Sequence, residues 1–193
     1  LEILDEPEKV KKELADLQSN LQSTAKWFYW IAGLSLINTI IIFEYYRQQT
    51  GAPDSSAYIV AGANKLSAIS YSTYTGYGSD FGSRSLTNNY TGDLITYNNL
   101  VTVMDEKHPS LILVNFKQVD KVGHSGNWQG YLNAITQVDS LIYQLWLKIQ
   151  SDPFYKDSTT LFITNDHGRH DDEHGGFVSH GDGCEGCSHI MCL

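Results

Sequence analysis

Two short apolar runs constrain the fold more than any other feature of the chain. They read LILVNF at 111–116 and TLFITN at 160–165. Continuous apolar runs of this length are typical of parallel strands that are covered on both faces. Between them, apolar residues recur at steps of four and three, which predicts an amphipathic helix from Tyr131 to Ile149. Strand, helix and strand form a βαβ unit. The predicted fold class is therefore α/β, a mostly parallel sheet with flanking helices.

Further elements are expected upstream of this unit. AYIVAG at 57–62 predicts a buried strand that ends in a glycine turn, and residues 66–71 are a second candidate strand. Residues 72–92 are rich in glycine, serine, threonine and asparagine, which predicts a long irregular surface loop. Asp93 to Lys107 is expected to be a helix that His108 and Pro109 end.

The charge balance and the cysteines exclude several classes of protein. The chain has 22 acidic and 13 basic residues, a formal charge of −9, and no basic run longer than Lys11-Lys12. Nucleic-acid binding through a phosphate-tracking patch is therefore not expected. Charged residues make up 18% and hydrophobic residues 41%, which excludes a disordered polyelectrolyte and a multi-span membrane protein. The three cysteines all lie between Cys184 and Cys192 and do not make a disulfide framework.

The first part of the chain differs in character from the rest, so we divide it into 1–43 and 44–193. Residues 5–26 carry dense charge around one apolar stripe, which predicts a helix that pairs as a short coiled coil or packs on its own domain. The stripe consists of Val10, Leu14, Leu17 and Leu21.

Trp27 to Phe43 is a run of 17 residues without a charge. As a helix it would be ~25 Å long, slightly short of the ~30 Å hydrocarbon core. Aromatic residues at both ends are typical of a membrane interface. We therefore expect a membrane-associated or cell-envelope protein, with residues 44–193 outside the cytoplasm, for instance in the periplasm. The alternative is a buried core helix followed by a strand over 39–43.

Acidic and histidine side chains follow both apolar runs. Asp120 and His124 come shortly after the first run, and Asp166 and His167 come directly after the second. The carboxyl ends of parallel strands meet in one crevice, so the two pairs should converge there. Carboxylate oxygen and imidazole nitrogen suit zinc, manganese or iron. Gly168, next in the chain, would let the backbone pass closely.

These segments, NFKQVDKVGHSG, ITNDHGRH and SHIMCL, resemble the alkaline phosphatase superfamily. That superfamily contains metal-dependent phosphatases, phosphodiesterases, sulfatases and cofactor-independent phosphoglycerate mutases. The resemblance runs from about Phe43 to the C-terminus and is strongest over 111–193. It implies two divalent ions, zinc or manganese, acting on a phosphate or sulfate ester, and two ions favour the phosphatase and phosphodiesterase branch. The implied ligands are Asp120, His124 and His189 for one ion and Asp166 and His167 for the other.

The distal ligand and the cysteines leave alternatives open. His180 competes with His189, which is favoured because it precedes the apolar stretch IMCL, as the family's last ligand precedes a strand. Cys184 and Cys187, with His189 and Cys192, could instead form a small structural zinc site. Plain reduced cysteines are the simpler alternative.

The resemblance also implies parts that we do not find. The superfamily needs a serine or threonine nucleophile and aspartate ligands from an N-terminal strand, and residues 1–42 contain no apolar run that ends in such a group. The family continues into further strands after its last ligand. We therefore expect an incomplete domain, a truncated or chimeric chain without an identified nucleophile. The expected function is a hydrolase-like protein for phosphoric or sulfuric esters with weak or no turnover. The alternative is a membrane-anchored, non-catalytic interaction protein with a structural metal site.

Overall fold

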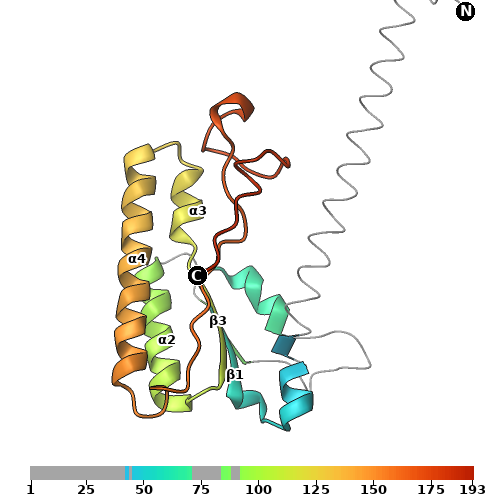
Figure 1. Ribbon diagram of the computed structural model, residues 1–193, viewed down its shortest axis with the longest axis vertical. Helices are drawn as coiled ribbons and strands as arrows, with labels where there is room; N and C mark the ends of the chain where they lie inside the picture. The colour runs from blue at the N-terminus through green and yellow to red at the C-terminus, as the bar shows by residue number, and fades with distance from the viewer. Residues whose placement is uncertain (1–41, 44, 71–83, 88–91) are drawn as a thin grey trace, which may run out of the picture.

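The computed structural model describes residues 42–43, 45–70, 84–87 and 92–193. The charged helix expected over 5–26 and all but the last two residues of the uncharged segment 27–43 lie outside the described residues. In the described part, a sheet lies between two layers of helices, and the C-terminal loops extend beyond one end of the sheet (Figure 1).

The sheet has three parallel strands, β1 (Ala57–Ala61), β2 (Arg84–Thr87) and β3 (Leu111–Asn115), in the order β2-β1-β3. Ile59 of the central strand lies opposite Ser85 on one side and Leu113 on the other. The predicted α/β class is confirmed. Parallel strands need crossover connections. Here α2 (Asp93–Lys107) connects β2 to β3, which lie on opposite sides of β1.

The helices after β3 are α3 (Gln118–Gly123) and α4 (Trp128–Ser151). Three short 3₁₀ helices are also present: η1 (Asp54–Ser56), η2 (Asn64–Ser70) and η3 (Asp172–His174). Residues 42–43 and 45–50 are helical as well. The expected limits of α2 are confirmed at both ends, and His108 ends this helix in the left-handed conformation. The side chain of Asn127 caps α4 by accepting a hydrogen bond from the Gly130 amide at 2.9 Å.

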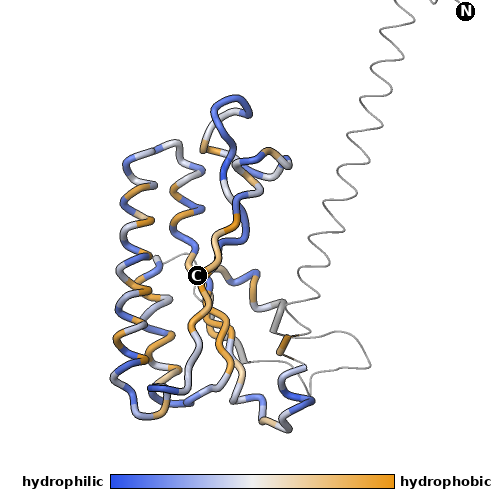
Figure 2. Tube along the Cα trace, in the orientation of Figure 1, coloured by the Kyte–Doolittle hydropathy of each residue, from blue (hydrophilic) through white to orange (hydrophobic). Residues whose placement is uncertain are grey.

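The core has two halves because successive side chains of each strand point to opposite faces of the sheet. Val60 faces α2 and α4, where it packs with Leu100 and Leu145. Ala57, Ile59 and Ala61 face the other way and pack with Phe43, with Tyr46, Leu66, Leu111 and Leu113 around them. The apolar strands form the hydrophobic centre in Figure 2, whereas the loops at the end of the sheet are mostly hydrophilic.

Two expectations for the segment after β1 are wrong. Residues 66–71 were expected to form a strand, but 64–70 form η2, in which the Ser67 hydroxyl donates to the Asn64 carbonyl at 2.8 Å. Such local side-chain bonds favour turns over strands. In contrast, β2 lies inside the stretch expected to be an irregular loop. The sequence RSLT is too polar to indicate a strand by itself, and the pairing with β1 decides its conformation.

The expected second buried strand at 160–165 is also wrong for this structure. The segment makes no ladder with β3, and Phe162 is 66% exposed. Leu161 still packs against the core. The backbone pairs instead with the last residues of the chain, because Ile163 and Leu193 exchange two hydrogen bonds of 3.0 Å around an antiparallel bridge from Thr164 to Cys192.

The last residue of the uncharged segment, Phe43, packs against the sheet as part of its core. Ile42 and Phe43 are helical, so a strand that continues through Phe43 is wrong at these two positions, and Phe43 is only 2% exposed. No helix within the described residues has the length and apolar content needed to cross a membrane.

A buried carboxylate joins α2 to the start of α3. Asp93 is 2% exposed, and its two oxygens accept hydrogen bonds from the backbone amides of Lys117 at 2.8 Å and Gln118 at 2.9 Å. Burial raises the pKa of Asp93, and these two hydrogen bonds oppose that rise. The first residues after β3 are thereby fixed to the first residue of α2.

Replacing Asp93 by alanine is expected to lower the free energy of unfolding substantially. Two backbone amides would lose their partner, at a cost of about 1–3 kcal/mol each. Urea unfolding measures the change. Asp139→Ala, at an exposed position of α4, is the matched control and should stay within about 0.5 kcal/mol of the parent. Equal effects of the two substitutions would contradict the role assigned to Asp93.

Candidate metal centre

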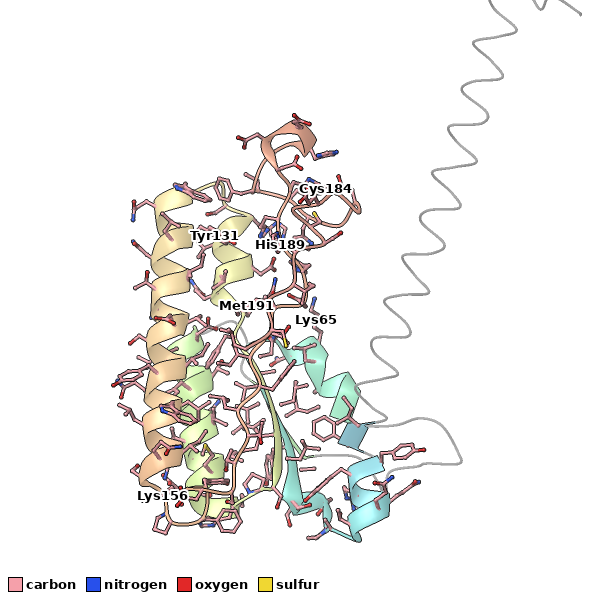
Figure 3. The ribbon with its side chains drawn as sticks, viewed as in Figure 1. Lys65, Tyr131, Lys156, Cys184, His189 and Met191 are labelled. Carbon is pink, nitrogen blue, oxygen red and sulfur yellow. The ribbon has the colours of Figure 1, made fainter. Side chains whose placement is uncertain are left out.

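The candidate site lies beyond the carboxyl end of β3, between α3 and the C-terminal loops (Figure 3). The chain leaves β3 at Asn115 and begins α3 at Gln118. One turn of this helix carries Asp120 and His124, and the His124 amide donates to the Asp120 carbonyl at 3.2 Å. The predicted spacing of four residues therefore places both side chains on one side of one helical turn.

Three imidazole rings converge on one carboxylate oxygen. Oδ1 of Asp120 lies 3.3 Å from Nε2 of His124, 3.3 Å from Nε2 of His180 and 4.0 Å from Nε2 of His167. The Nε2 atoms of His124 and His180 are themselves 3.1 Å apart. The rings of His167 and His180 stack with their centroids at 3.6 Å. Asp120, His124 and His180 thus present three ligand atoms within the size of one coordination shell.

The tautomers of two of these histidines follow from their other ring nitrogen. Nδ1 of His124 lies 2.9 Å from the Val178 carbonyl, and Nδ1 of His167 lies 2.9 Å from the Gly168 carbonyl. A carbonyl oxygen only accepts, so each Nδ1 carries the proton and donates it. In the neutral rings, each Nε2 then has a lone pair on the side of the Asp120 carboxylate. Metal-binding histidines are held in this way, with the second nitrogen bound to a carbonyl or carboxylate.

The electrostatic surroundings keep His180 neutral. Burial lowers the pKa of His180, and the neighbouring His167 lowers it further, while Asp120 opposes this. A histidine must be neutral to offer a lone pair to a metal ion. At neutral pH His180 is therefore suited to be a ligand.

Arg169 is a residue of the candidate site that the sequence pattern did not indicate. Its NH2 group donates to both the backbone oxygen of Asp120 at 2.8 Å and the Oδ1 atom at 2.7 Å, and its side chain is 10% exposed. Its NH1 atom is buried without a hydrogen-bond partner among the described residues. A Cβ atom at Gly123 would lie 2.5 Å from Arg169, so the glycine makes room for the guanidinium. The sequence feature that could have indicated Arg169 is its position directly after Gly168 in ITNDHGRH.

Gly168 has the close backbone contact that its sequence position predicted. The Gly168 amide donates to the Cys187 carbonyl at 2.9 Å, and a Cβ atom at this position would lie 1.9 Å from the Gly186 carbonyl oxygen. On the other side of the crossing, a Cβ at Gly186 would lie 2.3 Å from the Arg169 carbonyl oxygen. Two segments of the C-terminal loops therefore cross at a distance that only glycine allows.

The structure does not bring all five residues predicted as ligands into one group. Asp120, His124 and His167 come together as described, and Asp166 lies beside them, with its Oδ2 atom 3.6 Å from Nε2 of His167 and its side chain 84% exposed. His189 is not in the group that forms around Asp120; its backbone carbonyl accepts from Asn165 at 2.9 Å. His180, the competing candidate, occupies that place. The assignment of all five as metal ligands stays a prediction.

The cysteines are also arranged differently from the expected structural zinc site. Cys192 is exposed and takes part in the bridge with Thr164, whereas Cys184 and Cys187 lie close to His170 and Asp182. The described residues therefore contain a second group of ligand-type side chains, separate from the one around Asp120.

Comparison with known proteins links these features to one family. The model of the Metalloenzyme superfamily matches residues 64–189. Three similar proteins are 2,3-bisphosphoglycerate-independent phosphoglycerate mutases. The one from Gracilaria tenuistipitata var. liui is 32% identical over 71 residues, which cover 37% of this chain and 13% of that protein. The one from Ureaplasma urealyticum serovar 10 is 43% identical over 58 residues, 30% of this chain and 11% of that protein. The one from Legionella pneumophila strain Corby is 29% identical over 69 residues, 36% of this chain and 12% of that protein. Each match thus spans only about an eighth of the relative.

Proposed function

Because the chain belongs to the metalloenzyme superfamily, we propose that Asp120, His124 and His180 hold a divalent metal ion that serves chemistry at a phosphate ester. The observation that carries this proposal is the convergence of lone pairs on Asp120, with two Nδ1 atoms fixed on carbonyl oxygens. The relatives with the printed name phosphoglycerate mutase support a phosphorylated small-molecule substrate. One carboxylate oxygen and two imidazole nitrogens are ligands that suit zinc or manganese.

Each residue of the centre has a role in this proposal. Asp120 supplies negative charge, and the two histidines supply neutral nitrogen ligands. His167, with Asp166 next to it, would hold a second ion. Arg169 lies against Asp120, and its Nη1 atom, which has no hydrogen-bond partner in the described part of the chain, would donate to a phosphoryl oxygen. A bound ion of this kind polarises a phosphoryl oxygen and lowers the pKa of an attacking hydroxyl.

We infer hydrolysis of phosphate monoesters or diesters, at a low rate, as the activity to test first. In this proposal a water molecule is the attacking group. Sulfate esters are the second substrate class. The rival function is a non-catalytic metal-binding protein attached to a membrane through residues 27–43; this membrane location rests on the uncharged sequence alone.

The test is metal content and hydrolysis in the purified full chain loaded with zinc or manganese. The Asp120→Ala/His124→Ala variant is expected to lose about one equivalent of metal and the metal-dependent hydrolysis of p-nitrophenyl phosphate and bis-p-nitrophenyl phosphate. Parent turnover is expected to be far below the ~10 per second of a typical enzyme. Asp139→Ala is the control and should keep both properties.

The outcomes separate the two functions. Parent-like metal content in the double variant would refute the centre. Stoichiometric metal without hydrolysis of either ester would favour the non-catalytic binding protein.

A further inference from the structure

A second cluster of ligand-type side chains lies in the C-terminal loops, outside the centre around Asp120. It consists of His170, Asp182, Cys184 and Cys187, and one ligand atom from each lies within 4.8 Å of all the others. His170 comes from the segment after Gly168, and the other three come from the segment before His189. Figure 3 shows Cys184 in these loops, beyond the carboxyl ends of the strands.

The histidine of this cluster is prepared to bind a cation. Its Nδ1 atom lies 2.7 Å from the His174 carbonyl, so Nδ1 donates and, in the neutral ring, Nε2 keeps a lone pair. The Nε2 atom is buried and has no hydrogen-bond partner among the described residues, although Oδ1 of Asp182 lies 3.3 Å away. A lone pair and a carboxylate at this distance repel each other unless a proton or a metal cation lies between them.

The two cysteines present their sulfur atoms from one tight turn. The Cys187 amide points at the Cys184 sulfur at 3.4 Å, and the Cys184 amide donates to Asp182 at 3.0 Å. Backbone amides aimed at sulfur and carboxylate stabilise the negative charge of both groups, whereas burial raises the pKa of the Cys184 thiol. Cys187 is 8% exposed, which limits competition from water.

The distance between the His170 and Asp182 ligand atoms agrees with tetrahedral coordination. Bonds of about 2.0–2.1 Å from zinc to nitrogen and oxygen place two such ligands about 3.3–3.4 Å apart in a tetrahedron. The separation of 3.3 Å between His170 and Asp182 matches this value. Two thiolates with one imidazole and one carboxylate favour zinc over manganese, magnesium or calcium.

A competing group shares one of the cysteines. Asp171, His174 and Cys184 also lie close together. In that group the Asp171 carboxylate already accepts from both the ring and the backbone amide of His174, so its charge is satisfied without a metal. The first group contains two cysteine sulfurs and a histidine nitrogen without a hydrogen-bond partner among the described residues, and it is the better site.

We propose that His170, Asp182, Cys184 and Cys187 bind one structural zinc ion. The ion would join both ends of the 171–181 segment, which carries His180, and would hold that histidine beside Asp120. This four-ligand site differs from the sequence hypothesis, which paired the two cysteines with His189 and Cys192. It stands on its own residues and does not require that the Asp120 centre is catalytic.

Cobalt substitution tests this site directly, because thiolate-bound tetrahedral Co²⁺ gives a ligand-to-metal charge-transfer band in the near ultraviolet. The full chain, purified under reducing conditions, is expected to show this band. The Cys184→Ser/Cys187→Ser variant should lose it together with about one equivalent of zinc. Cys192→Ser is the matched control from the same chain and should keep both. A band that survives in the double variant, or that disappears in Cys192→Ser, would overturn the ligand set.

The Asp120→Ala/His124→Ala variant separates this site from the proposed catalytic centre. It should retain the charge-transfer band and one zinc ion, even if the proposed function fails. X-ray absorption of that zinc-loaded variant should show two sulfur neighbours at about 2.3 Å, a result that does not depend on whether the cysteine variants fold. Zinc with only nitrogen and oxygen neighbours, or a Cys184–Cys187 disulfide that excludes zinc, would refute the proposal.

Discussion

A Gly168→Ala variant is expected to bind metal at the Asp120 centre at least 10–100-fold more weakly than the parent. An added Cβ atom would lie 1.9 Å from the Gly186 carbonyl oxygen, so the two backbone segments must separate. Neither neighbour is the flexible end of a side chain. His167 and Arg169 flank Gly168, and both contact Asp120. Outer-shell changes at metal sites typically cost about 10–100-fold in affinity, and this change also moves a candidate ligand.

Titration of the metal-free chain with manganese, in parallel with circular dichroism, measures this effect. The helical signal should persist because α2 and α4 are packed on the sheet, away from the crossing. Asp139→Ala, at an exposed position of α4, is the control and should bind metal as the parent does. Unchanged affinity in Gly168→Ala, or an equal loss in Asp139→Ala, would show that the crossing does not position the centre.

The parts of the fold that were predictable are those in which one local pattern decides the outcome. The apolar runs of β1 and β3 have few alternatives, and the steps of four and three before Asp152 produce an amphipathic helix. The helix from Asp93 to Lys107 has a glycine before it and a proline after it. β2 was missed because its four residues become a strand only through pairing with β1. Residues 160–165 were misread because an apolar run does not specify which backbone it pairs with.

The candidate site divides in the same way. Asp120 and His124 lie one helical turn apart, so their proximity follows from the spacing alone. The approach of His180 depends on how the loop from Gly175 to Gly183 folds back, and a loop rich in glycine gives no periodic signal. Arg169 lies within the motif ITNDHGRH, but its contact with Asp120 requires the space left by Gly123, which the motif does not indicate. Contacts between two loops were therefore beyond the reach of the sequence pattern.

A His180→Ala variant is expected to lose about 100-fold or more in metal affinity at the Asp120 centre, whereas His189→Ala should change it little. In the structure, Nε2 of His180 lies 3.3 Å from Asp120 and 3.1 Å from Nε2 of His124, whereas the hydrogen bonds of His189 with Asn165 and Gly186 are made by its backbone. Removing a ligand should cost more than the 10–100-fold typical of outer-shell changes. Titration with manganese, which has little preference for thiolates, reports on this centre without interference from the cysteine cluster.

The pair of variants also decides between the structure and the family resemblance. The resemblance implies His189 as the distal ligand, and the geometry favours His180. A loss confined to His180→Ala would establish the arrangement described here. A loss confined to His189→Ala would mean that metal binding rearranges the loop after Gly186 and brings His189 to Asp120. In that case the stacking of His180 on His167 would be a property of the metal-free chain, and His180 would act by positioning His167 rather than by binding the ion.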